Sequence, residues 1–79
     1  MKIPRNLSGE QLVTALAKYG YVKTRQTGSH IRLTTTIKGE HHITIPNHSP
    51  IKVGTLNNIL KEVAEYLQIT RDDLIRDIF

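Results

Sequence analysis

His30 lies in a segment whose residue types could move a proton beside a bound phosphate. Gly28 and Ser29 precede it and predict a turn between two strands, because glycine adopts positive φ without steric cost. An imidazole titrates near neutral pH, and Arg25 and Arg32 on either side of the turn could bind phosphate oxygens. An isolated Gly-Ser-His tripeptide also occurs by chance. The rest of the chain must therefore decide whether this segment is a site.

Two further segments carry residues that suit the same chemistry. His48 follows a predicted strand and is a candidate for a second proton transfer; the alternative is a loop histidine that holds the turn after Pro46. Lys52 precedes a helix whose N-cap we expect at Thr55, and the free amides of that helix start could hold a phosphate. The alternative is an ordinary capped helix start. His41 and His42 are adjacent in a strand and face opposite sides, so they cannot share a metal ion, and we expect no metal or other cofactor.

Length and composition indicate one small domain over residues 1–79 with a thin core. The chain has no Cys, which fits the reducing cytoplasm. It also has no apolar run of the kind that forms a signal peptide or a membrane span. We therefore expect a cytoplasmic protein without a membrane partner.

Positive charge is concentrated in the first two thirds of the chain. Residues 1–54 hold eight Lys or Arg against two acidic residues, whereas 55–79 hold three against five, which gives the net charge of +4. A basic surface of this kind favours a polyanion as partner, although it is also compatible with a merely soluble basic protein.

The predicted elements are helix, three strands and helix, followed by a short third helix. A capping box at Ser8 predicts a helix over about 9–19 that ends at Gly20. Strands are expected over 21–25, 30–36 and 41–46, and a short helix over 71–78 after an N-cap at Thr70. The long helix from Gly54-Thr55 has an unbroken apolar stripe at Leu56, Ile59, Leu60, Val63, Ala64 and Leu67. We take 5–67 as the core of the domain and 70–79 as an extension whose apolar side either closes that core or forms a docking surface.

The alternation of apolar residues sets the register of the second hairpin. A loop of two residues would place the apolar residues of the two strands on opposite faces of the sheet. A loop of three, 37–39, pairs Leu33 with Ile43 and puts a glycine at the left-handed position that such loops use. The same register places His30 opposite Pro46 on the outer, more polar face.

Four segments, taken together, resemble one protein family. They are LAKYGY (Leu16–Tyr21), RQTGSH (Arg25–His30), ITIPNH (Ile43–His48) and KVGTLNNIL (Lys52–Leu60). Their order and spacing, over about residues 5–64, resemble the HicA (YcfA-like) toxins of bacterial and archaeal toxin–antitoxin pairs. The resemblance implies an α+β fold like that of double-stranded-RNA-binding domains, αβββα, with a three-stranded antiparallel sheet and two helices, here followed by a short C-terminal helix.

The resemblance also implies an activity, a site and a partner. Members of this family are metal-independent endoribonucleases that cut mRNA (mRNA interferases), and a cognate HicB antitoxin covers their site. The histidine that follows Gly-Ser is the family's catalytic residue, which assigns the general acid–base role to His30. We expect RNA to be bound by Arg25, Gly28, Ser29, Arg32 and Lys52.

Two departures from the family pattern leave alternatives open. Family members often stop soon after the second long helix, whereas this chain continues to Phe79, which leaves the oligomeric state and antitoxin docking undecided. That helix also has no lysine cluster at its start, which makes binding across a duplex groove less favourable. The alternatives to a nuclease are a non-catalytic RNA- or DNA-binding module and a degenerate toxin homologue kept as a regulator.

Overall fold

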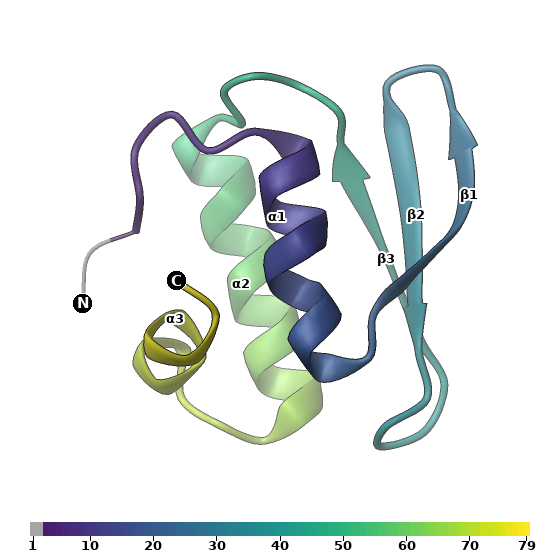
Figure 1. Ribbon diagram of the computed structural model, residues 1–79. Coiled ribbons are helices and arrows are strands. Elements are labelled where there is room, and N and C mark those ends of the chain that lie inside the picture. The colour runs from purple at the N-terminus through teal and green to yellow at the C-terminus, as the bar shows by residue number, and fades with distance from the viewer. Residues whose placement is uncertain (1–2) are drawn as a thin grey trace.

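Three antiparallel strands form a single sheet, and the helices all lie on one side of it (Figure 1). The computed structural model describes residues 3–79. This is the expected α+β arrangement αβββα with an additional C-terminal helix, so the predicted fold class is confirmed. The elements are helix α1 (Gly9–Leu16), the short 3-10 helix η1 (Ala17–Tyr19), strands β1 (Val22–Thr27), β2 (His30–Thr35) and β3 (His41–Pro46), and helices α2 (Val53–Leu67) and α3 (Arg71–Ile78).

Helix α1 begins at a capping box, as its sequence predicts. The Ser8 hydroxyl accepts the Gln11 backbone N–H at 3.1 Å, and the Gln11 side chain accepts the Ser8 N–H at 2.9 Å. These bonds satisfy amide donors that a first helical turn leaves without partners. The expected helix over 9–19 is α-helical as far as Leu16 and then tightens into η1. Gly20 ends it in the left-handed conformation, with φ of 79°.

Gly9, the first residue of α1, packs directly against the chain that follows β3. It is buried, and its N–H donates to the His48 carbonyl oxygen at 2.9 Å. A β-carbon at this position would lie 2.4 Å from the Pro46 carbonyl oxygen and 3.0 Å from the Asn47 α-carbon. Glycine therefore permits a close approach of α1 to the backbone of segment 46–48.

Replacing Gly9 by alanine should destabilise the fold, because backbone atoms must move away from the new methyl group. We expect a loss of about 1–3 kcal/mol in the free energy of unfolding, as for overpacked sites in general. Gly54 provides the control, because it lies in α2 and a β-carbon there would meet no packed neighbour within 4 Å. Gly54→Ala should stabilise the protein by up to about 1 kcal/mol. Urea unfolding distinguishes the two, and a shift of the same sign in both variants would contradict the packing role of Gly9.

The register of the β2–β3 hairpin follows the alternation of apolar residues and is confirmed. Leu33 pairs with Ile43, and His30 pairs with Pro46. β2 ends one residue earlier than the expected 30–36, and the connection contains a glycine with φ of 96°. The two apolar sets thus meet on the inner face of the sheet, next to the helices.

β1 is longer and less regular than the predicted strand over 21–25. It continues to Thr27, because Thr27 pairs directly with the first residue of β2 and so extends the ladder to the turn. The pairing register shifts between Lys23 and Arg25. Such a β-bulge sets two residues of one strand against one of its partner and increases the local twist.

Helix α2 begins three residues earlier than the sequence pattern predicts, so the assignment of Thr55 as its N-cap is wrong. The N-cap is Lys52, with φ of −62° and ψ of 139°, and no side chain caps this end. The Lys52 carbonyl oxygen accepts the Leu56 N–H at 2.9 Å. Thr55 is a favourable capping residue by type, but Val53 and Gly54 already take helical conformation and leave it inside the first turn.

The hydrophobic core lies between the sheet and the helices. All six residues of the α2 stripe are buried, as are the apolar residues that β2 and β3 direct inward. Segments outside the predicted apolar patterns add Leu7, Tyr21 and Ile51. The residues with the lowest exposure include Leu12, Leu16, Ile31, Leu33, Ile45, Leu60, Val63 and Leu74. None of the helices within residues 3–79 has both the length and the apolar composition that a membrane span requires.

The short helix α3 closes the core at its far side from the sheet (Figure 1). Its N-cap is Thr70, as predicted, and the Thr70 hydroxyl accepts the Asp73 N–H at 3.0 Å. Leu74 and Ile75 are buried, whereas the terminal Phe79 remains 41% exposed. Of the two roles weighed for this apolar side, closing the core is therefore the one observed.

Two hydrogen bonds also join the end of α3 to η1. The Lys18 ammonium donates to the Asp77 carbonyl oxygen at 2.8 Å, and the Tyr19 hydroxyl donates to the Asp77 carboxylate. That hydrogen bond, with a smaller contribution from burial, raises the pKa of Tyr19 from 10.0 to about 12. Because the pKa of Tyr19 is higher in the folded state than in the unfolded chain, the contact stabilises the fold at pH values below the pKa of the unfolded chain. This stabilisation is lost as the pH rises through the pKa of the folded state.

Candidate functional site

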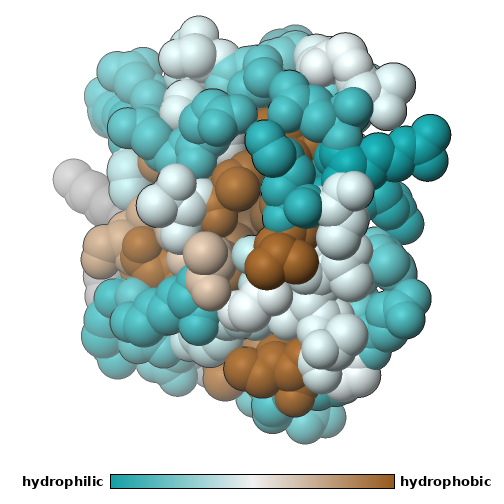
Figure 2. Space-filling view, turned by 45° about the vertical axis from the view of Figure 1, so that its right-hand side comes forward, coloured by the Kyte–Doolittle hydropathy of each residue, from teal (hydrophilic) through white to brown (hydrophobic). Residues whose placement is uncertain are grey.

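The outer face of the sheet is the face that the helices leave uncovered. Strand alternation places His30 and Arg32 there, exposed, while Ile31 and Leu33, which alternate with them, point into the core. Figure 2 shows mainly hydrophilic side chains over the upper and right-hand part of the surface turned toward the viewer. The outer face is therefore available to a polar partner.

A shallow hollow of about 180 Å³ lies on this outer face and is open to solvent. All three strands contribute to it: Arg25 and Thr27 come from β1, His30 and Arg32 from β2, and Thr44 from β3. The sequence predicts functional roles for three of these five residues: proton transfer for His30, and RNA binding for Arg25 and Arg32. The fold thus brings one imidazole and two guanidinium groups to the same place.

The turn that precedes His30 is fixed at both of its sides. Gly28 and Ser29 form it, as predicted, and Gly28 has φ of 56°. Thr27 and His30 pair across the turn, and the Asn47 N–H donates to the Ser29 carbonyl oxygen at 2.6 Å. These contacts hold the backbone of His30 at an ordered end of the sheet while its side chain stays exposed.

The two arginines of the hollow are cross-strand partners. Arg25 pairs with Arg32 just beyond the bulge in β1. Arg32 Nη1 donates to the Thr44 hydroxyl at 3.4 Å. In the part of the chain that the structure describes, no carboxylate forms an ion pair with either guanidinium. Like charges directly opposite in a sheet repel, so an anion that both groups can bind, such as a phosphate, would stabilise the hollow.

Two predicted site residues lie outside the lining of this hollow. His48 is exposed two residues beyond β3, where its carbonyl oxygen accepts the Gly9 N–H. Lys52 is the N-cap of α2 and lines a separate pocket. The proton-transfer role of His48 and the phosphate-binding role of Lys52 stay predictions.

Sequence reasoning missed the two threonines of the hollow. Thr44 lies opposite Arg32 in the predicted register, so the alternation pattern already contained the signal that it shares the outer face. Thr27 could not be placed, because the predicted first strand stopped before it. Threonine hydroxyls both donate and accept hydrogen bonds, so these side chains can contact a phosphate oxygen or a ribose hydroxyl.

His41 lies on the inner face, at the end of the sheet opposite His30, and contacts three other side chains. His41 Nδ1 is 2.8 Å from the Tyr21 hydroxyl, and His41 Nε2 is 3.2 Å from the Glu62 carboxylate. The His41 ring stacks on Tyr66 with the ring centres 4.4 Å apart. Burial raises the pKa of Tyr21, so its hydroxyl keeps its proton and the hydrogen bond to His41. These four side chains pack against one another and do not form an open site.

His42 faces the opposite side of the sheet from His41, as predicted. Its Nδ1 is 2.8 Å from the Thr34 hydroxyl, and its Nε2 is 2.6 Å from the Glu40 carboxylate. Within residues 3–79, no group of three His, Asp or Glu side chains is close enough to hold a metal ion.

Comparison with known proteins agrees with the resemblance seen in the sequence. No curated protein and no solved structure matches the chain. A family model described as the HicA toxin of bacterial toxin–antitoxin systems matches residues 9–64. The matched region extends from the start of α1 into α2 and includes every residue that lines the hollow. Because the match covers well over half of the sequence, the chain belongs to the HicA toxin family.

Proposed function

We propose that this protein is a metal-independent endoribonuclease that cuts mRNA, with His30 as its general acid–base residue. Family membership makes it the toxin of a toxin–antitoxin pair and implies an antitoxin partner. The observation that carries the proposal is the hollow in which His30 lies with Arg25 and Arg32. It combines a proton-transfer group with two guanidinium cations on an exposed face of the sheet.

RNA supplies its own nucleophile, so cleavage needs only a general base, a general acid and stabilisation of the charged phosphate. His30 takes the proton of a ribose 2′-OH as the 2′-oxygen attacks the adjacent phosphorus. The bond from phosphorus to the 5′-oxygen breaks, and that oxygen gains a proton from an acid, for which His48 is a candidate. The products are a 2′,3′-cyclic phosphate and a 5′-hydroxyl. A general base contributes about 10²–10⁴ in rate, and the arginines stabilise the charge on the crowded phosphate.

The test is cleavage of a defined RNA whose 2′-OH at the cut site is replaced by hydrogen. The unmodified RNA should be cut in the presence of EDTA and leave a cyclic or 3′-phosphate, whereas the modified RNA should remain intact. Cutting of both substrates at the same rate would rule out this mechanism. Binding of RNA without cleavage of either would favour the non-catalytic binding module or a degenerate toxin.

Phosphate binding by the basic residues has its own measurable consequence. Arg25→Gln, Arg32→Gln and Lys52→Gln should each lower the slope of log affinity against log salt by about 0.7, as expected for one lost contact to single-stranded nucleic acid. The measurement is a fluorescence-anisotropy titration of one labelled RNA over a range of salt concentrations.

Arg76→Gln is the matched control for these variants. It removes the same charge from α3, which lies across the helices from the sheet (Figure 1). Its salt slope should equal that of the wild type. Equal slopes for all four variants would show that RNA affinity does not depend on these phosphate contacts.

A further inference from the structure

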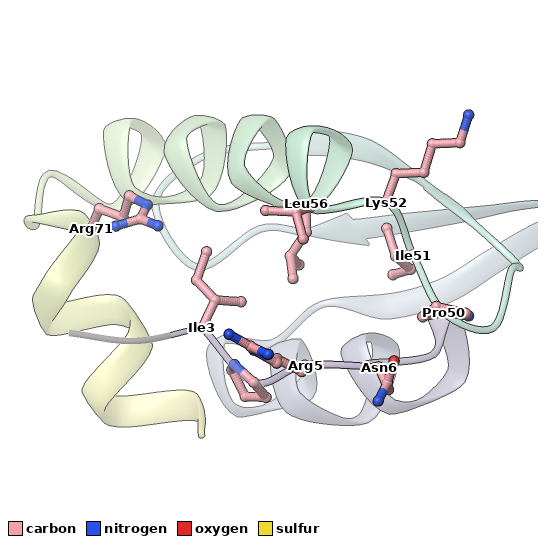
Figure 3. Close-up of a pocket in the computed structure, with 10 residues that line it drawn as sticks. Ile3, Arg5, Asn6, Pro50, Ile51, Lys52, Leu56 and Arg71 are labelled. Carbon is pink, nitrogen blue, oxygen red and sulfur yellow. The ribbon is translucent and has the colours of Figure 1, made fainter.

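A pocket of about 680 Å³ lies between the N-terminal arm (residues 3–6), the loop before α2, and the first turns of α2 and α3 (Figure 3). We call it the arm pocket. None of the described residues that line it also lines the hollow around His30. Its volume is that of sites that bind drug-sized molecules, which is enough for a few residues of an extended peptide.

One part of the arm pocket is apolar. Ile51 and Leu56 are already buried, with 4% and 2% of their surface exposed, whereas Val53, which also lines the pocket, is 65% exposed. Ile3 and Leu56 point toward one another across the space (Figure 3). An apolar side chain placed here would remove the exposed surface of Val53 from water, which is favourable in proportion to the area covered.

The other part of the arm pocket is cationic. Arg5 is exposed on the arm, and Arg71 enters from the start of α3. Arg71 donates to the Asn57 side-chain oxygen and lies 3.9 Å from the exposed Asp72 carboxylate, so its guanidinium is held in place. Among the described residues that line the pocket, none is acidic. Lys52 extends away from it (Figure 3) and adds positive charge only at the outside.

We propose that the arm pocket binds a short peptide segment of a protein partner, in which apolar side chains are flanked by carboxylates. The apolar side chains cover Val53 and the partly buried Ile3, and the carboxylates pair with Arg5 and Arg71. Family membership supplies a partner of the right kind, the antitoxin. The proposal rests on that membership and not on the proposed nuclease activity.

Peptide fits this lining better than RNA does. Phosphates would satisfy the two arginines but would leave the exposed apolar surface of Val53 in contact with water. Single-stranded RNA gains affinity by stacking its bases on aromatic rings, and no aromatic residue is among the described residues that line the pocket. Only a ligand with both apolar and anionic groups can contact the apolar part and the cationic part of the pocket favourably.

The test is an NMR titration of the full-length, nitrogen-15-labelled protein with an acetylated hexapeptide of two leucines flanked on each side by two glutamates. Backbone amide signals of Ile51, Val53 and Leu56 should shift, while those of His30 and Arg32 should not. Peptides with glutamine in place of glutamate, or with serine in place of leucine, should each bind about tenfold more weakly.

Two valine variants separate specific binding from general attraction to a basic protein. Val53→Asp places a carboxylate in the pocket lining and should weaken peptide binding by about tenfold. Val22→Asp makes the same change at a valine of β1 that is 58% exposed, against 65% for Val53, and should stay within about twofold of the wild type.

Three results would overturn the proposal. They are the absence of shifts at about 1 mM peptide, equal weakening by the two valine variants, and arm-pocket shifts with an RNA hexamer but not with the peptide. RNA cleavage by Val53→Asp is measured in parallel and should match the wild type. Because the peptide readout does not depend on cleavage, failure of the nuclease proposal and failure of this one are distinguishable.

Discussion

Replacing His30 by alanine should lower RNA cleavage by about 10²–10⁴-fold, which is about 3–5 kcal/mol in the activation barrier. The fold should not change, because His30 is exposed at the start of β2 and its loss opens no cavity. RNA affinity should change little, since the phosphate is expected to be bound by Arg25 and Arg32. The measurement is single-turnover cleavage of one defined RNA at equal bound fraction of wild type and variant.

His42→Ala is the matched control for this experiment. His42 is an exposed histidine on the same outer face, but it does not line the hollow. It should cleave at the wild-type rate. Equal cleavage by wild type and His30→Ala would withdraw the catalytic assignment and favour the binding module.

Leu60→Ala should lower the free energy of unfolding by about 2–5 kcal/mol, the range for buried leucines. Leu60 has no exposed surface and lies in the middle of the apolar stripe of α2. Truncation removes transfer free energy and leaves a cavity that neighbouring side chains fill only in part. The total free energy of unfolding of a small domain is about 5–15 kcal/mol, so the variant should unfold at a clearly lower urea concentration than the wild type.

The neighbouring Lys61 provides the control, because it is exposed on the same helix. Lys61→Ala should change the free energy of unfolding by less than about 0.5 kcal/mol. Urea unfolding followed by circular dichroism measures both variants. A loss below about 0.5 kcal/mol for Leu60→Ala would mean that this part of α2 does not face the core.

Most of the fold could be predicted because its signals are local. The capping box at Ser8, the apolar stripe of α2 and the alternation in β2 and β3 each depend on residues close in sequence. The start of α2 was predicted wrongly, because Thr55 has the right chemistry for a cap while the backbone at Lys52 decides where the helix begins. The bulge in β1 carries no composition signal, since it arises where one strand must match another.

The candidate site could be predicted in part for the same reason. Gly28, Ser29 and His30 are contiguous, so the turn and the exposed imidazole follow from sequence alone. The pairing of Arg25 with Arg32 depends on the bulge. The position of Lys52 at the arm pocket depends on how the N-terminal arm packs against the start of α2. Both of these contacts depend on how the folded backbone brings separate segments together, and the spacing of residues in the sequence does not indicate them.

The one-sided sheet has a consequence for how this protein tolerates sequence change. Consecutive residues of β2 face different environments, so a substitution at Arg32 alters surface charge, while one at the adjacent Leu33 alters packing. Outer-face positions can therefore diversify at nearly constant folding free energy. If this face binds RNA as proposed, substrate recognition can change by single substitutions while the packing of the sheet against the helices stays the same.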